Sequence, residues 1–574
     1  MHLVAWVAFF ALAYFASIGD LIQAPGVFLG TSGDAIKNNF TFLYQLRFGM
    51  SATHFHGLNF PFGDHVVMTD GQPMLVWLLR LLGLGGTDGP SVEFLLGVHN
   101  GLLLLEMPIA AGLLYRVFRA LRLSVSEAWV AGASLALMSP QVLRWGGHYA
   151  LGHVAVLPLA LWLQIKRWTG PAPGRGWGIA IAANSLFWGF IHPYYLPILA
   201  LLSLVLESGL QARCGLAWKR KRRIVPILVQ VLLPLSAFLA FMKLTDPIID
   251  RGSAEAVFNT TFAGVFLTRW RDLLGAIDPG LRSQFAIPNF EGIIPLGLCA
   301  LPLLWVVLFG AVTLLKRRKR LGSRLSLLIH LLFAAVLALI FSFGFHLEGS
   351  WAPFFAQVPP IRQFRSVARF AWVFALGFSV VSVACSVRVL RWAGITGRIP
   401  RRSSRALIWV LLFFQAGESI LWFQWNLREL RTRITRLERT ALPGLDRIDV
   451  RQYQAVLPLP YFHVGSGGSD DLAADDPTLR QSLLLSLATG IPNLGSHLSR
   501  SSLSQARLLV GAIHRGENRQ HWIDTLSPSA DLLVWIGRRE LLTPAEESLA
   551  RLSEPIDAVE GQGLFRLRVS HLKK

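Results

Sequence analysis

Polar and charged side chains gather in one stretch of an otherwise apolar chain, between Gly33 and Pro73. Two carboxylates, Asp34 and Asp70, stand near its ends. Between them lie side chains that can donate hydrogen bonds to a substrate: Lys37, Asn38, His54, His56 and Asn59. Long loops on a rigid scaffold commonly carry function, whereas an ordinary connection has only about 4–6 residues. We expect a site here, and a solvated connection between two spans is the alternative.

The two carboxylates suit general base catalysis, in which a carboxylate takes the proton of an attacking hydroxyl. Asp34 is the candidate base. It starts a predicted helix in the run Gly33-Asp34-Ala35, where an aspartate is also a common N-cap, so capping alone is the alternative. Asp70 would orient the acceptor, or hold a divalent cation together with Asp34, because hard cations prefer oxygen ligands.

His54 and His56 are two residues apart and lie on one side of an extended segment. A pair of histidines can bind zinc, but no third ligand follows at a convincing spacing. Contact with the acceptor or a phosphate, or placement at the membrane interface, is the simpler interpretation. The metal ligands are therefore unknown, no cofactor is certain, and a divalent cation stays open.

Cationic side chains near the ends of apolar segments form a second candidate set: His148, His153, Arg269, Arg362, Arg365 and Arg369. Arginine suits phosphate because its planar fork donates two parallel hydrogen bonds. Arg362, Arg365 and Arg369 repeat at spacings of three and four residues, which places them on one face of a helix. We interpret this face as the contact for a lipid phosphate, and anchoring in lipid headgroups is the alternative.

The composition indicates a membrane protein. Of the 574 residues, 53% are hydrophobic and 16% are charged, whereas a soluble protein carries about 25% charged residues. The formal net charge of +21 suggests nucleic acid at first, but the basic residues form short clusters between apolar segments, so no nucleic-acid partner is expected. The three cysteines form no CxxC pair, which argues against a disulfide framework or a thiolate metal site.

Apolar segments recur along the first three quarters of the chain and predict about eleven membrane spans. They lie near residues 3–19, 95–115, 126–139, 153–166, 177–191, 193–207, 224–244, 292–315, 325–345, 367–387 and 406–424. The first segment is either a span or a signal peptide. Glu106 lies inside the second segment, beside Met107 and Pro108. An acid within a membrane is a candidate functional group, and pairing inside the helix bundle is the alternative.

One orientation explains every dense basic cluster between the spans. The clusters occupy residues 116–122, 166–175, 219–223, 316–320 and 391–405. The positive-inside rule places all of them on the cytoplasmic side. The loops 20–94, 140–152, 192–195, 245–291 and 346–366 then lie outside. We therefore expect the N-terminus inside and a large first outer loop at residues 20–94.

The composition changes near Trp425, beyond which charge rises and apolar runs shorten. Strands are predicted at residues 455–459, 532–536 and 564–569, and helices at 477–488, 503–513 and 544–552. We divide the chain into a transmembrane domain at residues 1–424 and a small α/β domain at residues 425–574. The odd number of spans places the second domain outside the cell membrane.

Three short motifs accompany this layout: Gly33-Asp34-Ala35, Gly147-His148 with Gly152-His153, and the run from Pro359 to Phe370. With the first outer loop, they resemble the GT-C superfamily of integral-membrane glycosyltransferases, in an uncharacterised bacterial branch. Ala35 stands where related families often carry a second acid. The expected fold class is a polytopic α-helical membrane protein, GT-C-like, with a small C-terminal extracytoplasmic α/β domain.

The resemblance implies an inverting glycosyltransferase of the bacterial inner membrane that works on the cell envelope. Its donor would be a polyprenyl-phosphate sugar, and its acceptor a hydroxyl of a glycan, lipid or protein on the outer face. The alternative is a transporter or flippase of a lipid-linked or polar solute, which Glu106 favours. Transporters commonly show paired halves, and we find none in this sequence. An assembly protein whose outer domain binds partners is a third class.

Overall fold

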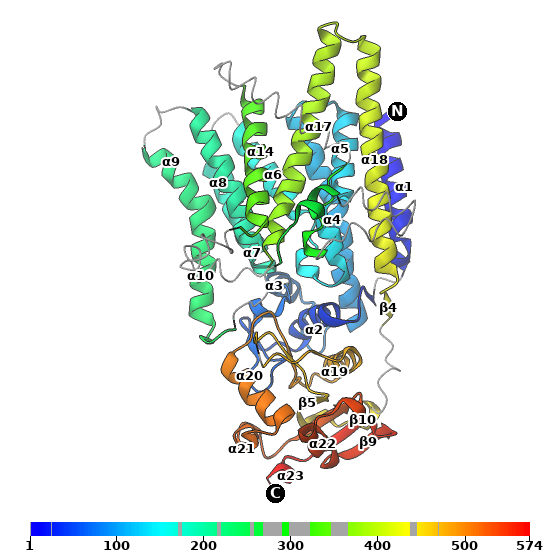
Figure 1. Cartoon of the computed structure of the whole chain (residues 1–574), viewed down its shortest axis with the longest axis vertical. Coiled ribbons are helices and arrows are strands. Elements are labelled where there is room, and N and C mark those ends of the chain that lie inside the picture. Colours follow the sequence, from blue (N-terminus) through cyan, green and yellow to red (C-terminus); the bar gives the residue numbers. More distant parts are fainter. Residues whose placement is uncertain are drawn as a thin grey trace.

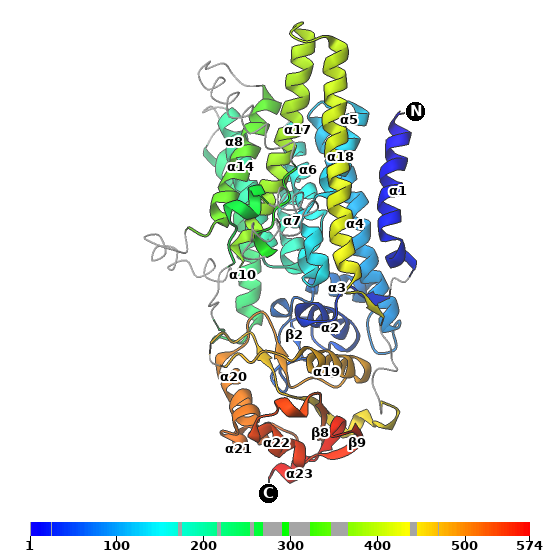
Figure 2. The same ribbon diagram turned by 45° about the vertical axis from the view of Figure 1, so that its right-hand side comes forward.

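The computed structural model describes residues 2–23, 26–169, 175–214, 220–252, 258–267, 290–297, 322–345, 366–436, 445–468 and 470–573. Long helices form one end of the molecule, and a smaller part that contains a sheet forms the other (Figure 1). The chain begins at the helical end and finishes at the far tip of the smaller part. A layer built from the first long loop lies between them (Figure 2).

The helical end is a bundle whose helices run roughly along one axis (Figure 1). They are α1 (His2–Gln23), α4 (Val92–Ala120), α5 (Val125–Leu137), α6 (Val156–Thr169), α7 (Arg175–Ile191), α8 (Tyr195–Cys214), α9 (Arg220–Ile227), α10 (Leu233–Thr245), α14 (Ser323–Ser342), α17 (Ala371–Ile395) and α18 (Arg401–Arg431). Within the described ranges, 7 helical segments are long and apolar enough to cross a membrane. The chain is therefore an integral membrane protein.

The predicted spans agree with these helices in order and place, with differences in length. The span predicted at 177–191 is the 17-residue helix α7, which is not among the seven membrane-length segments of the described chain. The span predicted at 126–139 is the 13-residue helix α5, which is shorter than the roughly 20 residues that a bilayer requires. The span predicted at 292–315 lies mostly outside the described residues, so the count of eleven stays a prediction. The turn predicted at His192 does separate α7 from α8.

A proline inside α4 is compensated by a contact from α1. Pro108 lies within the helix and, since it lacks an N–H, leaves the carbonyl of Leu104 without its helical donor. The hydroxyl of Tyr14 donates to that carbonyl at 2.5 Å. The contact satisfies an acceptor in a region that water does not reach and ties α1 to the bundle.

Arginines gather at the end of the bundle opposite the sheet. Arg391 donates to the carbonyl of Arg122 at 2.9 Å, and Arg324 donates to the carbonyl of Ala120 at 2.8 Å. α18 begins at Arg401 at the same end (Figure 1). The fold thus brings together basic turns that the positive-inside rule assigns to one side of a membrane.

The first long loop folds into a layer across the other end of the bundle. It contains α2 (Gly33–Phe48), α3 (Pro73–Leu81) and the antiparallel pair β2 (His54–Phe55) and β3 (Asp64–His65). The sequence predicts helices at residues 34–48 and 74–84, both lying along the membrane surface, and that placement stays a prediction. In the structure α2 is buried, because Ile36 and Phe40 share one core with Leu483 of α19 (Asp476–Thr489).

The sheet has four strands in the order β5-β8-β10-β9. They are β5 (Tyr453–Leu459), β8 (Asp531–Ile536), β10 (Gln562–Leu567) and β9 (Glu554–Val559). β5 runs parallel to β8, with Val456 opposite Leu533, and the other two pairs are antiparallel. The sequence predicts β5, β8 and β10 and misses β9. As an edge strand β9 is only partly buried, so it lacks a clear apolar alternation.

Alternate residues of the two parallel strands face different cores. Leu457 and Val534 pack on the side of α20 (Leu503–Val510) and α22 (Pro544–Arg551), both predicted from the sequence. Val456 packs on the other side with Leu485 of α19. α19 therefore lies between the sheet and α2. Through α19 the sheet supports the layer that carries the polar stretch.

Candidate functional site

Asp34 lies in the first turn of α2 and keeps 43% of its side chain exposed. The N-cap position of this helix is Ser32, whose side chain makes no capping hydrogen bond, so Asp34 lies inside the first turn and not at the N-cap. Three nitrogens surround the Asp34 carboxylate, each 3.6 Å away: Lys37 Nζ, His148 Nε2 and His497 Nε2. An ionised carboxylate in this setting is open to solvent on one side and can accept a proton.

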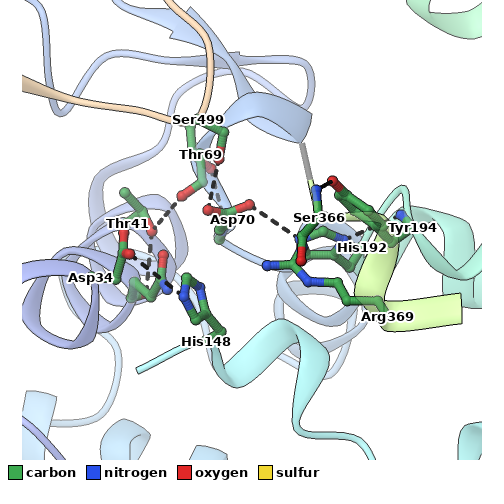
Figure 3. Close-up of polar contacts among 12 residues, drawn as sticks. Asp34, Thr41, Thr69, Asp70, His148, His192, Tyr194, Ser366, Arg369 and Ser499 are labelled. Carbon is green, nitrogen blue, oxygen red and sulfur yellow. Dashed lines mark hydrogen bonds and ion pairs between the residues drawn. The ribbon is translucent and has the colours of Figure 1, made fainter. Parts of the chain in front are cut away.

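Asp70 lies in a turn after the short helix Val66–Thr69 and is much less exposed, at 15%. Lys37 Nζ is 2.8 Å from Oδ2, and the Ser499 hydroxyl donates to the same oxygen at 2.7 Å. His192 Nε2 lies 3.4 Å from Oδ1. Figure 3 shows Asp70 with its partners converging from separate segments of the chain. Each oxygen of this carboxylate thus faces a protein group.

The backbone around Asp70 is constrained. Asp70 and Gln72 have φ angles of 58° and 55°, with Gly71 between them. Aspartate tolerates the left-handed region, but glutamine does so less readily, and such a residue costs about 1–3 kcal/mol unless its surroundings hold it. Pro73 follows, which further limits Gln72. The surrounding contacts must therefore fix this turn.

Lys37 joins the two acids. Its side chain is 1% exposed, and its ammonium lies between Asp34 and Asp70. Burial disfavours the charged ammonium, but Asp70 and Asp34 outweigh this effect and raise the pKa of Lys37. Burial likewise opposes ionisation of the acids, and Lys37 overcomes it: the pKa of Asp34 is lowered, and that of Asp70 falls well below its usual value. Both acids are therefore ionised at neutral pH.

The histidines of the site are neutral at pH 7. Burial lowers the pKa of His148 and of His497 to about 4, although Asp34 acts in the opposite direction. Burial also lowers the pKa of His192 against the effect of Asp70. Within the described residues, Nδ1 of His497 and Oδ1 of Asn38 are buried without a protein partner. Buried polar atoms of this kind are commonly paired with water or a ligand.

A buried cluster of arginines lies beside the acids. Glu291 accepts hydrogen bonds from Arg369 at 2.9 and 3.2 Å and pairs with Arg144 at 3.0 Å. The Arg369 guanidinium stacks on Tyr194, 4.4 Å from the ring centroid. Despite burial, the charges of Arg144 and Arg369 depress the pKa of Glu291 far below its usual value. Among the described residues, two buried cations contact the same anion, which makes this part of the site electropositive.

The arginine cluster and the acids belong to one site. In Figure 3, Asp34 and Arg369 lie on opposite sides of Asp70. The charge of Arg369 contributes to the lowered pKa of His148 and His192, after burial as the main cause for both. The Ser366 backbone N–H donates to the Tyr194 hydroxyl at 2.6 Å. An anion that entered here would meet a positive region beside two fixed carboxylates.

Other predicted side chains have different surroundings. Asn38 donates to the carbonyl of Gly147 at 2.6 Å, which joins α2 to the loop that carries His148. Asn59 is buried and donates to Gln505 Oε1 at 2.9 Å, so it supports the loop. The rings of His54 and His56 lie 4.4 Å apart. In the part of the chain that the structure describes, no contact joins either ring to Asp34 or Asp70.

His153 has both ring nitrogens engaged by protein groups. Nδ1 lies 2.6 Å from Glu106 Oε1, and Nε2 lies 2.8 Å from Gln72 Oε1. His153 therefore supports the turn that contains Asp70, through its contact with Gln72. Three further predicted residues, Arg269, Arg362 and Arg365, lie outside the described residues, and their roles stay predictions.

Several residues of the site were not predicted from the sequence. His192 was visible only as part of a turn between spans, although it reaches Asp70. His497 belongs to β7 (Ser496–His497), and Ser499 follows it, more than four hundred positions beyond the acids. Glu291 gave no signal of its own beyond being an acid in an outer loop. The packing of α19 against α2, together with backbone hydrogen bonds such as Ser499 N–H to the Met68 carbonyl at 3.1 Å, brings these residues to Asp34 and Asp70.

The sequence allows a divalent cation between the two acids. The Lys37 ammonium occupies the space between Asp34 and Asp70 and already supplies positive charge there. Within the described chain, no group of three or more His, Cys, Asp or Glu side chains is arranged to hold a metal ion. The cation between these two carboxylates is therefore the Lys37 ammonium.

An apolar pocket opens beside the arginine cluster. Its lining comes from α4, α5, α6 and α17 and includes Leu114, Leu135, Val154, Leu157, Trp372 and Leu376. Trp372 also contacts the cluster, since the Arg144 guanidinium lies 5.7 Å from the centroid of its ring. The same tryptophan therefore borders a cationic region and an apolar one, as amphipathic ligands require.

Comparisons with solved structures find matches of low similarity. It is similar to the Archaeoglobus fulgidus oligosaccharyltransferase in the apo form, with 12% identity, a TM-score of 0.46, and coverage of 92% of this chain and 69% of that one. It is also similar to ArnT from Cupriavidus metallidurans in the apo state, with 13% identity, a TM-score of 0.42, and coverage of 99% and 98%.

Both solved structures belong to the GT-C superfamily, which the sequence motifs also resemble. Likeness at this level gives no activity to this chain, which has to be inferred from its own residues. None of the curated proteins matches the chain. One family model covers residues 7–418, well over half of the sequence, and the chain belongs to that family, described as "Domain of unknown function (DUF6311)".

Proposed function

We propose that the protein is a membrane glycosyltransferase that moves a sugar from a polyprenyl-phosphate donor to an acceptor hydroxyl on the outer face. One observation carries the proposal. A half-exposed, ionised carboxylate, Asp34, lies beside neutral histidines and a buried ammonium, next to a cationic cluster at the end of a membrane bundle. This arrangement supplies a base and an anion site together.

Asp34 acts as the general base. It is the more accessible of the two acids, and its carboxylate is ionised at neutral pH because Lys37 lowers its pKa against the effect of burial. As the acceptor oxygen attacks the anomeric carbon, Asp34 takes its proton, a step that contributes about 10²–10⁴-fold. Attack from the face opposite the phosphate inverts the anomeric centre.

Asp70 has a different role, because its oxygens are already occupied by Lys37, Ser499 and His192. It holds the Lys37 ammonium beside Asp34. The ammonium keeps Asp34 ionised before attack, and His148 and His497 then face the acceptor as neutral donors or acceptors. Asn38 Oδ1 and His497 Nδ1 are buried and have no hydrogen-bond partner within the described chain, so each can form a further hydrogen bond with the acceptor.

Arg369 and its neighbours receive the phosphate of the donor. Glu291 engages Nε and Nη2 of Arg369, whereas Nη1 has no acceptor within the described chain and is left for a ligand. As the glycosidic bond breaks, negative charge grows on the departing phosphate, and fixed cations stabilise it. The predicted partners Arg362 and Arg365 precede this residue in the chain and would extend the contact.

The apolar pocket next to Trp372 lies where the first isoprene unit of the donor would enter the bundle. It is lined by apolar side chains of the bundle and borders the arginine cluster through Trp372. A polyprenyl phosphate needs this combination, because its head is anionic and its tail is hydrocarbon. In this orientation the site faces the outer side of the bacterial inner membrane, and the basic turns face the cytoplasm.

Turnover of labelled donors tests the proposal. Purified protein in lipid nanodiscs is mixed with a panel of undecaprenyl-phosphate sugars and with membranes from cells that lack the protein as the acceptor source. We expect loss of one labelled donor and release of undecaprenyl phosphate. Asp34→Asn abolishes this turnover, whereas the matched control Asp88→Asn, an exposed acid in the same loop, retains it.

A lipid-linked solute transporter is the second candidate, and one contact favours it. Glu106 and His153 form a close pair, 2.6 Å apart, inside the bundle, and buried acids of this kind couple ions to transport. Vesicles distinguish the two functions. A transporter moves the labelled lipid between leaflets and leaves its glycosidic bond intact, whereas the enzyme cleaves that bond.

A further inference from the structure

Four polar side chains form a continuous buried line between the bundle and the Asp70 turn. Glu106 Oε1 contacts His153 Nδ1 at 2.6 Å, and His153 Nε2 contacts Gln72 Oε1 at 2.8 Å. The Gln72 amide nitrogen then contacts His99 Nε2 at 2.8 Å. Gln72 and His99 are 1% and 0% exposed. No step of the proposed sugar transfer uses this line.

One helix supplies both ends of the line. His99 and Glu106 are both in α4, seven residues and thus about two turns apart, so they share a face. Gln72 and His153 fill the space between them. Glu106 is fixed in turn, because its second oxygen accepts the Ala155 N–H at 3.3 Å. The line therefore has rigid supports at both ends.

The atom types determine what each group does. The Gln72 oxygen can only accept, so His153 Nε2 carries a proton and donates to it. The Gln72 amide nitrogen can only donate, so His99 Nε2 accepts and its proton is on Nδ1. The amide of Gln72 is thus held in one orientation between two imidazoles.

Gln72 is also a residue whose backbone needs support. It has the left-handed φ of 55° and precedes Pro73. Its carbonyl accepts the Leu75 and Val76 N–H groups at 2.9 and 3.1 Å, so it starts α3. Asp70 is two residues earlier, and a relaxed Gln72 would rotate the turn and carry the Asp70 carboxylate away from Lys37.

We propose that Glu106 and His153 are positioning residues which hold Gln72, and through it the Asp70 turn, in the geometry that Lys37 and Asp34 require. This inference rests on the proposed function for its effect on turnover. The geometric claim itself stands apart from the reaction. Hydrogen bonding is the operative property, and the negative charge of Glu106 is dispensable.

A glutamine at position 106 separates positioning from ion coupling. In Glu106→Gln the amide nitrogen donates to His153 Nδ1 and the amide oxygen accepts the Ala155 N–H. Every contact of the line is then kept with a neutral His153. Glu106→Leu removes both contacts. Gln72→Met keeps the shape of the side chain and removes its two hydrogen bonds.

Hydrogen–deuterium exchange of the intact protein in nanodiscs tests the geometric claim without any substrate. In Glu106→Leu and Gln72→Met, we expect amides of residues 66–76 to exchange at least about tenfold faster, because local opening becomes easier. Amides of β5 should be unchanged. Glu106→Gln should match the wild type within about twofold. The control Gln164→Leu removes another buried amide contact, to Gln230 at 3.2 Å, and should leave residues 66–76 unaffected.

Turnover provides the second readout. If the protein transfers sugar, Glu106→Leu should lower kcat about 100-fold, as expected for a misplacement near 1 Å, with the donor KM changed less than about threefold. Glu106→Gln should restore kcat. Unchanged exchange in both disruptive variants overturns the proposal, and so does a Glu106→Gln variant that behaves like Glu106→Leu. A wild type that turns over no donor refutes the proposed function, and exchange still decides this inference.

Discussion

The Lys37 ammonium lies 2.8 Å from the Asp70 carboxylate and ties the helix that carries Asp34 to a turn 33 residues later in the chain. The same ammonium lies 3.6 Å from Asp34. One buried cation is thus shared unequally between two acids. The stronger contact keeps Asp70 in place, and the weaker one leaves Asp34 available for a proton.

This inequality predicts different outcomes for the two acids. Asp34→Asn removes the base and keeps the shape of the side chain, so transfer should fall at least about 10²-fold while folding and donor binding persist. Asp70→Asn leaves Lys37 with a weaker partner and should both slow transfer and lower thermal stability. Turnover and unfolding temperature, measured together, separate these effects. Near-normal turnover in Asp34→Asn with a well-folded, inactive Asp70→Asn would move the base to Asp70.

Arg369 is expected to govern the donor more than the acceptor. Arg369→Lys keeps one positive charge beside Glu291 but loses the planar fork that binds Glu291 and leaves Nη1 for a phosphate. We expect the donor KM to rise about tenfold, while the acceptor KM stays within about threefold. Arg391→Lys, at the opposite end of the bundle, is the matched control. Equal changes in both KM values would make Arg369 a packing residue.

The sequence predicts those parts of the fold and the site that depend on residues close together in the chain. Asp34, Lys37 and Asp70 share one polar stretch, and the three do meet in the fold. The helices of the bundle and three strands of the sheet also follow from apolar periodicity. These features depend on neighbours in sequence, which a single chain displays directly.

The remaining parts of the site depend on tertiary packing. His497 and Ser499 reach the acids because Leu483 of α19 packs against α2 and because the Ser499 N–H donates to the Met68 carbonyl at 3.1 Å. The start of α2 at Gly33, which places Asp34 inside the first turn, and the contact of His153 with Glu106 likewise depend on the three-dimensional structure. No local spacing encodes such pairs, since the partners come from segments far apart in the chain.

Acid should destabilise the protein through its buried histidines. Burial lowers the pKa of His148 and of His497 from 6.5 to about 4. Between these values the unfolded chain binds protons that the folded imidazoles do not, so this stability is complete above pH 6.5 and is lost as the pH falls towards 4. The lowered pKa of Asp70 acts in the same direction at still lower pH.

The unfolding temperature of the detergent-solubilised protein should therefore fall between about pH 7 and about pH 4.5. In the double variant His148→Gln/His497→Gln this fall should be smaller. It should not vanish, because burial also lowers the pKa of His65 and His463 to about 4. The exposed His521→Gln is the control and should keep the wild-type slope. A double variant with an unchanged slope would contradict the neutral, buried state of these two rings.

The orientation in the membrane is the last prediction. Basic turns gather at one end of the bundle and the site lies at the other, so the positive-inside rule predicts an outward-facing site. Single cysteines are placed in a background in which Cys214, Cys299 and Cys385 are replaced. Met50→Cys and Ser529→Cys should react with an impermeant maleimide in intact cells, since both positions are exposed near the site and in the sheet region. Thr396→Cys, exposed in the turn between α17 and α18, should react only after the cells are permeabilised. Labelling of Thr396→Cys alone in intact cells would reverse the orientation and place the sugar donor on the cytoplasmic face.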